Sequence, residues 1–151
     1  MAMNMKIEKI QLNDEYLKEL ISLSEKWKDE DCSYGMVTNS KEDIHQPIYV
    51  AIENDKIIGY IFGHYYVQEK HMSAIDVGTK CFMVDELYVL PEYRNQGIGH
   101  MLFQTLENEA NKQAQFLTLN TSTKDYHKIL HFYVEELDMN FHSAFLFKKY
   151  E

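Results

Sequence analysis

The feature that most constrains the fold of this chain is a strand that ends in a glycine-containing turn and runs on into a helix, over residues 85–99. Gly97 and Gly99 carry no side chain that could block an approaching ligand, and the backbone N–H groups from Asn95 onward would point toward an anion at the start of the helix. Arg94, the only arginine in the sequence, precedes them. We therefore predict a phosphate-binding turn here.

Two motifs in this order resemble the GNAT superfamily of N-acetyltransferases. Arg94-x-x-Gly97-x-Gly99 after an apolar strand resembles the acyl-CoA-binding motif of that family. His131-Phe132-Tyr133, near the end of a later helix, is similar to the Phe-Tyr pair that supplies an acid to the departing thiolate. The resemblance covers residues 5–149. It implies one domain over residues 1–151 of α/β class, with a twisted, mostly antiparallel mixed sheet, splayed middle strands and flanking helices.

Hydrophobic periodicity and turn residues give the same order of elements. Asn13 or Asp14 can cap a first helix, Ser40 starts a capping box for a short one, and Asn54-Asp55 suits a hairpin turn. We expect residues 29–46 to be largely irregular. The predicted strands are 6–12, 47–52, 56–67, 80–90, 115–121 and 141–149, and the later helices are 98–114 and 125–137.

The chain departs from the family pattern at three positions. Asn95 and Asp138 stand where the family commonly has glycine, and both residue types tolerate a left-handed backbone. Tyr126 stands seven residues before Tyr133, where the family often has an asparagine that contacts the pantetheine arm. The residues that could replace that asparagine are Asp125, Lys124 and Asn120.

The cofactor that the resemblance implies is acetyl-CoA. A backbone N–H on the strand near residues 87–89 would meet the thioester oxygen, because splayed strands leave such groups unpaired. The residues expected to bind the cofactor are Leu87, Tyr88, Val89, Arg94, Asn95, Gln96, Gly97, Ile98, Gly99, His100, Asn120 and Asp125.

The chemistry requires a base and an acid. An aliphatic amine with a pKa near about 10.4 is protonated at neutral pH, so a carboxylate must accept a proton. Asp85 and Glu86 are the candidates, since the resemblance to polyamine acetyltransferases places an acidic pair there. Strand residues alternate in direction, so we favour Glu86 unless a bulge intervenes. Tyr133 is the expected acid. The structural alternatives are that Asp85 and Glu86 merely border the strand and that Tyr133 is a tyrosine packed on its helix.

The acceptor is expected to be a cation. The net charge of −9 favours a cationic amine and argues against nucleic acid. The expected substrate-binding residues mix aromatic rings with carboxylates in the irregular segment, although such loops are often merely solvated. They are Trp27, Asp29, Glu30, Asp31 and Tyr34.

The remaining composition bounds the class of protein. No apolar run approaches the roughly 20 residues of a membrane span, and residues 1–5 do not resemble a signal peptide, so we expect a cytoplasmic protein. Cys32 and Cys81 are expected to be reduced, and no residue spacing predicts a metal site. The expected partners are a small-molecule amine and a second copy in a homodimer, with neither nucleic acid nor membrane.

The predicted function is acetyl transfer from acetyl-CoA to a primary amine of a small cationic molecule that resembles a polyamine or an aminoglycoside. Two alternatives remain open. One is acetylation of a protein lysine or N-terminus, which an open groove with few acidic walls would favour. The other is a non-catalytic acyl-CoA-binding or regulatory module, which the loss of the asparagine at position 126 allows.

Overall fold

The computed structural model describes residues 4–151. Residues 1–3, part of the N-terminal stretch that was compared with a signal peptide, lie outside the described residues. The strands are β1 (Met5–Ile10), β2 (Ile48–Glu53), β3 (Lys56–Val67), β4 (Lys80–Val89) and β5 (Phe116–Thr118). The α-helices are α1 (Asp14–Asp29), α2 (Ile98–Ala110) and α3 (Tyr126–Leu130), and the last continues as a π-helical turn, η3 (His131–Glu136). Short 3₁₀ turns, η1 (Lys41–Asp43) and η2 (Pro91–Tyr93), complete the set.

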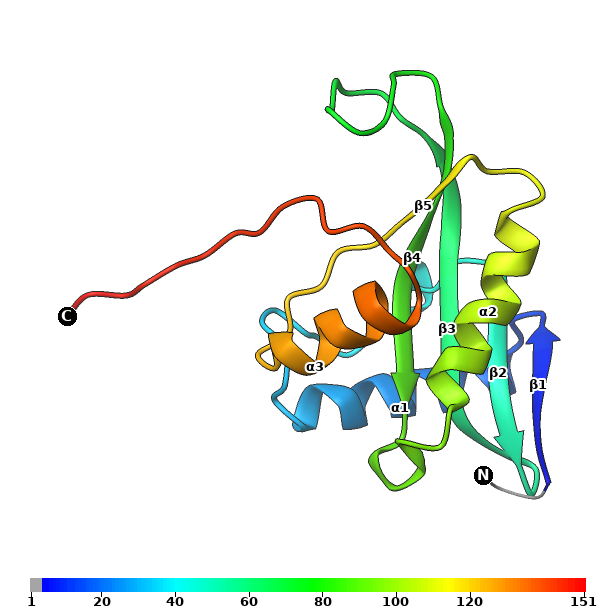
Figure 1. The fold of residues 1–151 in the computed structure, drawn as a ribbon. Coiled ribbons are helices and arrows are strands. Elements are labelled where there is room, and N and C mark those ends of the chain that lie inside the picture. The colour runs from blue at the N-terminus through cyan, green and yellow to red at the C-terminus, as the bar shows by residue number, and fades with distance from the viewer. Residues whose placement is uncertain (1–3) are drawn as a thin grey trace.

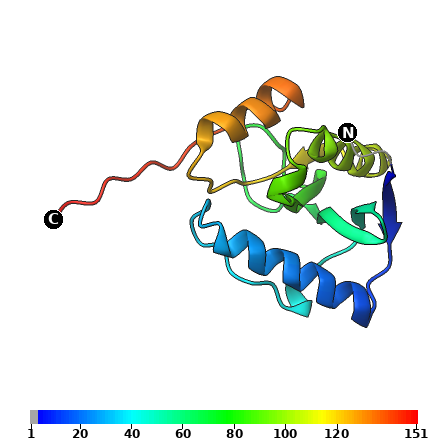
Figure 2. The ribbon, with the colours of Figure 1, turned by 90° about the horizontal axis from the view of Figure 1, so that it is seen from below.

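The five strands form one mixed sheet in the order β1-β2-β3-β4-β5. The first four pair antiparallel, whereas β4 and β5 pair in parallel. Helix α1 lies on one face of the sheet and α2 on the other, with α3 beside the N-terminal end of α2 (Figures 1 and 2). The predicted fold class, a mixed α/β sheet flanked by helices, is confirmed.

The core lies between the central strands and the helices on both faces. Tyr60, Phe62 and Phe82 of the sheet are fully buried, as are Leu102 and Phe103 of α2. Apolar residues recur along α2 at helical spacing, so that one side of the helix packs on β3 and β4. Burial of this face holds the start of α2 against the end of β4. None of the helices in the described residues is both long and apolar enough to cross a membrane.

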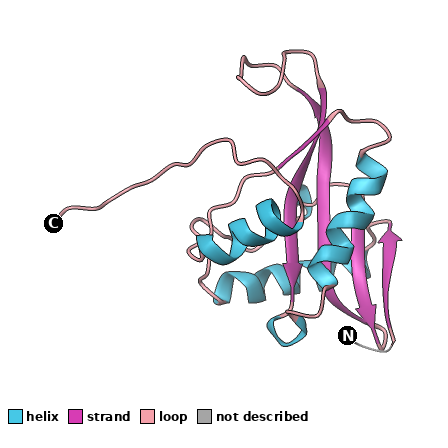
Figure 3. Ribbon diagram, viewed as in Figure 1, coloured by secondary structure: helices cyan, strands magenta, loops and turns pink. Residues whose placement is uncertain are grey.

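Most predicted elements are observed within a few residues of their expected bounds (Figure 3). The hairpin turn at Asn54 and Asp55 is left-handed at both residues, as its sequence suggests. Asn13 caps α1 by accepting a hydrogen bond from Tyr16 N–H at 2.8 Å. The irregular segment begins one residue later than predicted, because Asp29 still belongs to α1.

The predicted last strand, 141–149, is wrong for the described chain. These residues form no strand and extend away from the body of the molecule (Figure 1). A strand requires a neighbouring strand to pair its backbone groups. The last backbone hydrogen bond toward the C-terminus joins Met139 N–H to the carbonyl of Tyr133, and the backbone beyond it forms no hydrogen bond with the backbone of other described residues.

Candidate active site

The turn before α2 has the backbone geometry that an anion site needs. Asn95 adopts φ 64° and Gly97 φ 82°, both left-handed, and the sequence anticipated this tolerance at Asn95. A Cβ placed on Gly97 would meet no other atom within 4 Å. The space beside Gly97 is therefore open, at the start of the 13-residue helix α2, where the first N–H groups lack intrahelical partners and the helix dipole favours negative charge.

Gly99 serves a different purpose from Gly97. A Cβ at Gly99 would lie 3.4 Å from Cζ of Phe132, so the missing side chain lets the η3 segment approach the first turn of α2 closely. The two sequence motifs, whose residues 99 and 132 lie 33 positions apart, thus touch each other. This contact holds the segment that carries Tyr133 against the first turn of α2.

The side chain of Arg94 is occupied by hydrogen bonds to other groups of the protein. Its Nε donates to the carbonyl of Val89 at 2.9 Å, and its two terminal nitrogens lie 2.8 and 2.9 Å from the carboxylate oxygens of Glu30. The hydroxyl of Tyr88 also donates to Glu30, at 2.6 Å, and the ring of Tyr88 stacks on Trp27. This bidentate pair ties the end of α1 to the end of β4. Contact between Arg94 and phosphate stays a prediction.

The strands β4 and β5 diverge as predicted. Their pairing ends at Met83 and Thr118, while β4 continues for six more residues. Leu90 N–H donates to Ile58 of the segment that contains β3, and bonds alternate along an antiparallel pair. The backbone groups of Leu87 and Val89 therefore point away from β3, toward the side that β5 has left. Those of Tyr88 face β3.

A β-bulge determines how the acidic pair is presented. Phe62 pairs with Glu86 and Gly63 with Val84, so that Asp85 is the extra residue of β4. A bulge interrupts the alternation of side chains. Asp85 bonds His64, and Glu86 bonds Tyr60, two residues on the same face of β3. Both carboxylates therefore emerge on the α1 face.

The expected alternation in direction between Asp85 and Glu86 therefore does not hold here. The bulge is the physical reason, because it shifts Asp85 onto the face that Glu86 occupies.

Glu86 is a partly buried carboxylate held at a fixed position. Its Oε1 accepts hydrogen bonds from the hydroxyl of Tyr60 at 2.7 Å and from Nδ2 of Asn39 at 2.9 Å. Asn39 is itself fixed, because its N–H donates to Ser24 of α1. Burial raises the pKa of Glu86 above its ordinary value, although both hydrogen bonds oppose that shift. A carboxylate with a raised pKa is a stronger base than an exposed one.

Tyr133 lies half-buried in η3, on the side of the sheet that α2 covers. Its ring packs near Phe103 of α2 and against Phe132. Burial raises the pKa of the Tyr133 phenol to about 12. Within the described residues the structure shows no hydrogen bond from this hydroxyl. The phenol thus keeps its proton throughout the physiological range and can donate it.

Two histidines that are not among the predicted site residues lie beside the acidic pair. Nδ1 of His45 lies 3.0 Å and Nδ1 of His64 lies 2.9 Å from Oδ2 of Asp85. The three ligand atoms lie within 4.8 Å of one another, so this cluster could hold a metal ion that accepts imidazole and carboxylate ligands, such as Zn²⁺. No sequence spacing signals it, because the residues come from three segments that the sheet brings together.

The predicted acceptor residues do not form a single cluster. Glu30 is engaged by Arg94, and Trp27 packs on Tyr88, so both stabilise the end of α1. Asp29 is exposed. Asp31 pairs with Lys124, whose ammonium also lies 5.4 Å from the ring of Tyr34. This pair joins the loop after α1 to the segment before α3, where Tyr34 N–H donates to the carbonyl of Ser122.

The residues that could replace the family's asparagine at position 126 differ in their surroundings. Asp125 caps α3 by accepting from Lys128 N–H at 3.4 Å, and Lys124 is paired as described. Tyr126 is exposed at the first position of α3, and Asn120 is exposed after β5. Asp138, the other replacement for glycine, adopts the left-handed φ of 57° that its sequence suggested.

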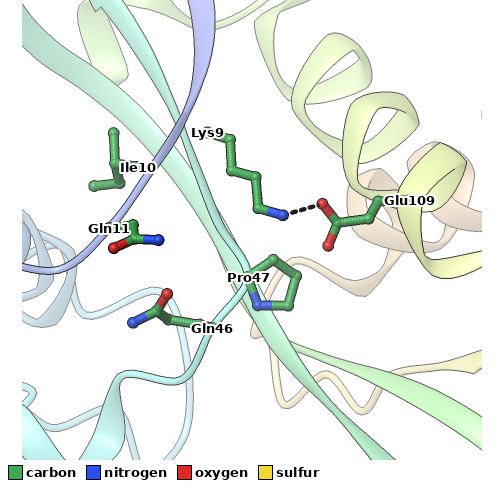
Figure 4. A pocket seen from close by; sticks show the side chains of 6 residues that line it. All are labelled: Lys9, Ile10, Gln11, Gln46, Pro47 and Glu109. Atoms are coloured by element: carbon green, nitrogen blue, oxygen red, sulfur yellow. Dashed lines mark hydrogen bonds and ion pairs between the residues drawn. The ribbon is translucent and has the colours of Figure 1, made fainter.

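A hollow of about 510 Å³ lies elsewhere on the molecule. It lies between the end of β1, α2 and the segment that precedes β2. Lys9 and Glu109, which both line it, form an ion pair (Figure 4). Its lining residues are Lys9, Ile10, Gln11, Gln46, Pro47 and Glu109. None of them was predicted to belong to the active site. The predicted site residues lie instead on β4, in the turn that follows it and in the segment packed on the start of α2.

Comparison with known proteins identifies the class of this fold and site. The model of the acetyltransferase (GNAT) family matches residues 11–139. Among curated proteins no significant match was found. An aminoglycoside acetyltransferase from an uncultured soil metagenomic sample, solved in complex with sisomicin, is 18% identical with a TM-score of 0.68, over 98% of this chain and 97% of that one.

Two further solved structures are similar over nearly their whole lengths. The aminoglycoside N-acetyltransferase AAC(6')-Iy in complex with CoA is 16% identical, with a TM-score of 0.65 over 97% of this chain and 99% of that one. A ribosomal-protein-alanine N-acetyltransferase from Brucella melitensis biovar Abortus 2308 is 15% identical, with a TM-score of 0.68 over 99% of this chain and 100% of that one. At these identities the likeness supports the shared fold.

The chain belongs to the acetyltransferase (GNAT) family and is an acyltransferase that uses acetyl-CoA. The residues present fit such a donor. Gly97 leaves space in front of the free N–H groups of α2, and Leu87 and Val89 turn backbone groups toward the side from which β5 diverges. An anionic, extended molecule can lie along this path with its phosphates at the helix and its thioester beside β4.

Proposed function

We propose that this enzyme acetylates a primary amine of a small cationic acceptor, with Glu86 as the base and Tyr133 as the acid. The observation that carries the proposal is the environment of Glu86. It is a carboxylate of raised pKa, fixed by Tyr60 and Asn39 at a bulge in β4. An exposed strand-end carboxylate would need neither the fixed position nor the burial.

The base and the acid approach β4 from opposite faces. Glu86 and Tyr60 lie on the face that α1 covers, and Tyr133 packs with Phe103 on the face of α2. Acetyl-CoA supplies the electrophilic thioester carbonyl when bound. Glu86 then accepts a proton from the attacking amine, and Tyr133 Oη holds the proton that the departing sulfur requires. Backbone N–H groups of Leu87 and Val89 lie on the side of the strand where they can stabilise negative charge on the carbonyl oxygen.

The acidic balance of the protein supports a cationic acceptor. The net charge of −9 attracts amines, and Asp85 and Asp43 both lie close enough to Glu86 to raise its pKa. Two of the similar solved structures are aminoglycoside acetyltransferases, one with sisomicin bound. Polyamines and aminoglycosides are therefore the first acceptors to test.

A second candidate is acetylation of a protein amine. A solved structure with the same fold is a ribosomal-protein-alanine N-acetyltransferase. The exposure of His45 and His64, beside Asp85, is compatible with a groove that could admit a peptide N-terminus. Small-molecule and peptide acceptors must therefore be compared side by side.

The test is release of CoA thiol from acetyl-CoA in the presence of a panel of polyamines, aminoglycosides, amino acids and peptides. We expect turnover with at least one polycationic small molecule, a much lower kcat/KM with peptides, and turnover reduced about 10²- to 10⁴-fold in Glu86→Gln at neutral pH. Efficient turnover with peptides alone would support the second candidate. Binding of acetyl-CoA without turnover by any acceptor would support the non-catalytic module.

We also propose that the protein is cytoplasmic and forms a homodimer. Two free cysteines, Cys32 and the buried Cys81, suit a reducing compartment. Fractionation of cells that produce the protein tests the compartment.

A further inference from the structure

The cluster of His45, His64 and Asp85 has no part in the proton transfers proposed for Glu86 and Tyr133. Its two imidazoles approach the same carboxylate oxygen. Nδ1 of His45 lies 3.0 Å and Nδ1 of His64 lies 2.9 Å from Oδ2 of Asp85. The centroids of the two imidazole rings are only 5.1 Å apart. Two nitrogen atoms and one oxygen atom, each able to bind a cation, therefore converge on one small volume.

Each of the three side chains is positioned by a different part of the fold. His64 belongs to the central strand β3. The bulge in β4 brings Asp85 onto the same face of the sheet. His45 follows η1, whose capping box fixes the backbone, and the preceding residue, Ile44, is buried in the core. The fold itself therefore holds the three atoms together.

The spacing of the three atoms is close to that of a metal site. In a tetrahedral zinc site with bonds of about 2.0–2.2 Å, neighbouring ligand atoms lie roughly 3.3–3.5 Å apart. The two N···O distances are slightly shorter than this, and all three atoms lie within 4.8 Å of one another. A small outward rotation of the side chains would therefore make room for the ion.

The ligand atoms select the class of cation. Imidazole nitrogen suits Zn²⁺, Ni²⁺ and related transition metals, whereas Mg²⁺ and Ca²⁺ are bound by oxygen ligands. Nδ1 of a neutral histidine can bind a metal when the ring carries its proton on Nε2. Within the described residues no protein group bonds Nε2 of His45 or His64, so solvent can accept that proton. The cluster therefore favours a transition metal over Mg²⁺.

The cluster is accessible and lies among acidic groups. The side chains of His45 and His64 expose 48% and 36% of their surface, and that of Asp85 exposes 18%. Asp43 lies close enough to both His45 and Glu86 for their charges to interact. Three protein ligands also leave the fourth tetrahedral position to water. A cation can therefore reach the cluster, and the surrounding negative charge favours its binding.

We infer that His45, His64 and Asp85 bind one divalent transition-metal ion of the class of Zn²⁺, through two Nδ1 atoms and Oδ2. The bound ion joins the segment before β2 to β3 and to the bulge in β4, and so stabilises the sheet at that point. The site goes beyond acetyl transfer, because it requires neither acetyl-CoA nor an acceptor. Two hydrogen bonds to Asp85, with no affinity for a metal, are the alternative that the experiments must exclude.

The first test measures binding of ZnCl₂ to the full chain by calorimetry, after treatment with a chelator and without acetyl-CoA. We expect one zinc ion per chain and no competition from Mg²⁺. His45→Gln and His64→Gln should each weaken binding about 100-fold or more, because even the loss of a group that only orients a ligand costs roughly 10- to 100-fold.

Two control variants address other zinc-binding groups. His71→Gln is the matched control, since His71 is an exposed histidine in the loop between β3 and β4. Cys32→Ser removes a free thiol, which also binds zinc. Both variants should bind one zinc ion with the affinity of the wild type.

The second test measures stability. Because the ion binds only the folded chain at this site, Zn²⁺ should raise the melting temperature of the wild type and of His71→Gln but not that of His45→Gln. Mg²⁺ should leave all three unchanged. If His64→Gln fails to fold, His45→Gln still decides the matter, since His45 is exposed and lies outside the strands.

Four outcomes would overturn the inference: no zinc binding by the wild type, binding that survives loss of either cluster histidine, binding that is lost in Cys32→Ser, and equal binding of Mg²⁺. None of these measurements depends on turnover. The metal site can therefore be disproved while the catalytic proposal stands, and the reverse also holds.

Discussion

Glu86 is the residue on which proton removal from the amine is expected to depend. Glu86→Gln keeps an oxygen that can accept from the hydroxyl of Tyr60 but cannot take up a proton. We expect turnover to fall about 10²- to 10⁴-fold near neutral pH and to recover partly at high pH, where more amine is already neutral. A kcat/KM profile from about pH 6 to about pH 10 measures both effects.

The direction in which the activity of the wild-type enzyme changes with pH follows from the raised pKa of Glu86. Activity should decline as the pH falls through that pKa, because the protonated carboxyl cannot act as a base. Asp85→Asn is the matched control, since Asp85 lies on the same face but bonds His45 and His64. If Asp85→Asn shows the alkaline recovery and Glu86→Gln does not, then Asp85 is the base.

Tyr133 is the second residue with a distinct kinetic signature. Tyr133→Phe removes one hydroxyl and leaves the packing against Phe103 and Phe132 in place. We expect a loss of about 10²- to 10⁴-fold in kcat, no alkaline recovery and unchanged affinity for acetyl-CoA. Because burial raises its pKa to about 12, the wild-type phenol should cause no alkaline loss of activity below that pH.

Tyr126→Phe is the matched control for Tyr133→Phe, because Tyr126 lies exposed at the start of the same helical segment. It should behave like the wild type. Near-normal turnover by Tyr133→Phe would rule out its role as the acid.

Among the elements, the turn that leads into α2 is the one that a single substitution should disable. Gly97→Glu puts an anionic side chain where the helix N–H groups face open space, so acetyl-CoA should no longer raise the melting temperature. Gly78→Glu is matched in backbone strain, because Gly78 also has a positive φ, 91°, and open surroundings. It should keep the full thermal shift. An unaltered shift in Gly97→Glu would exclude the turn from the cofactor site.

Elements whose cause is local could be predicted from the sequence. The left-handed residues Asn95 and Asp138 and the hairpin at Asn54 follow from the chemistry of single side chains. The bulge at Asp85 could not be predicted, because it is a property of the pairing between β3 and β4. The contacts of Arg94 with Glu30 and of Asp85 with two histidines likewise depend on which segments the sheet joins.

At the scale of the whole molecule, charge should control the acceptor more than the donor. Salt screens the attraction between a protein of net charge −9 and a polycation, so KM for the amine should rise with ionic strength. KM for acetyl-CoA should change little or fall, because the anionic donor is repelled at low salt. Initial rates from about 10 mM to about 1 M NaCl test this. A KM for the amine that does not change with salt, or a preference for neutral acceptors, would contradict the electrostatic argument.

The whole-molecule arrangement was only partly open to prediction. The order of elements and the divergence of β4 from β5 follow from hydrophobic periodicity and the family resemblance. The final strand, 141–149, was predicted from its apolar pattern, and this prediction is wrong for the described chain. A pattern records that a segment prefers to be paired, but it does not say with which edge.

The contact between Gly99 and Phe132 also bears on how such a sequence can change over generations. A methyl group at position 99 would just touch the ring at 3.4 Å, and anything larger would push the segment that carries Tyr133 out of place. A lineage could therefore accept a bulkier residue at 99 only together with a smaller one at 132. We expect these two positions to covary among descendants, and an otherwise damaging Gly99→Val to be rescued by Phe132→Ala.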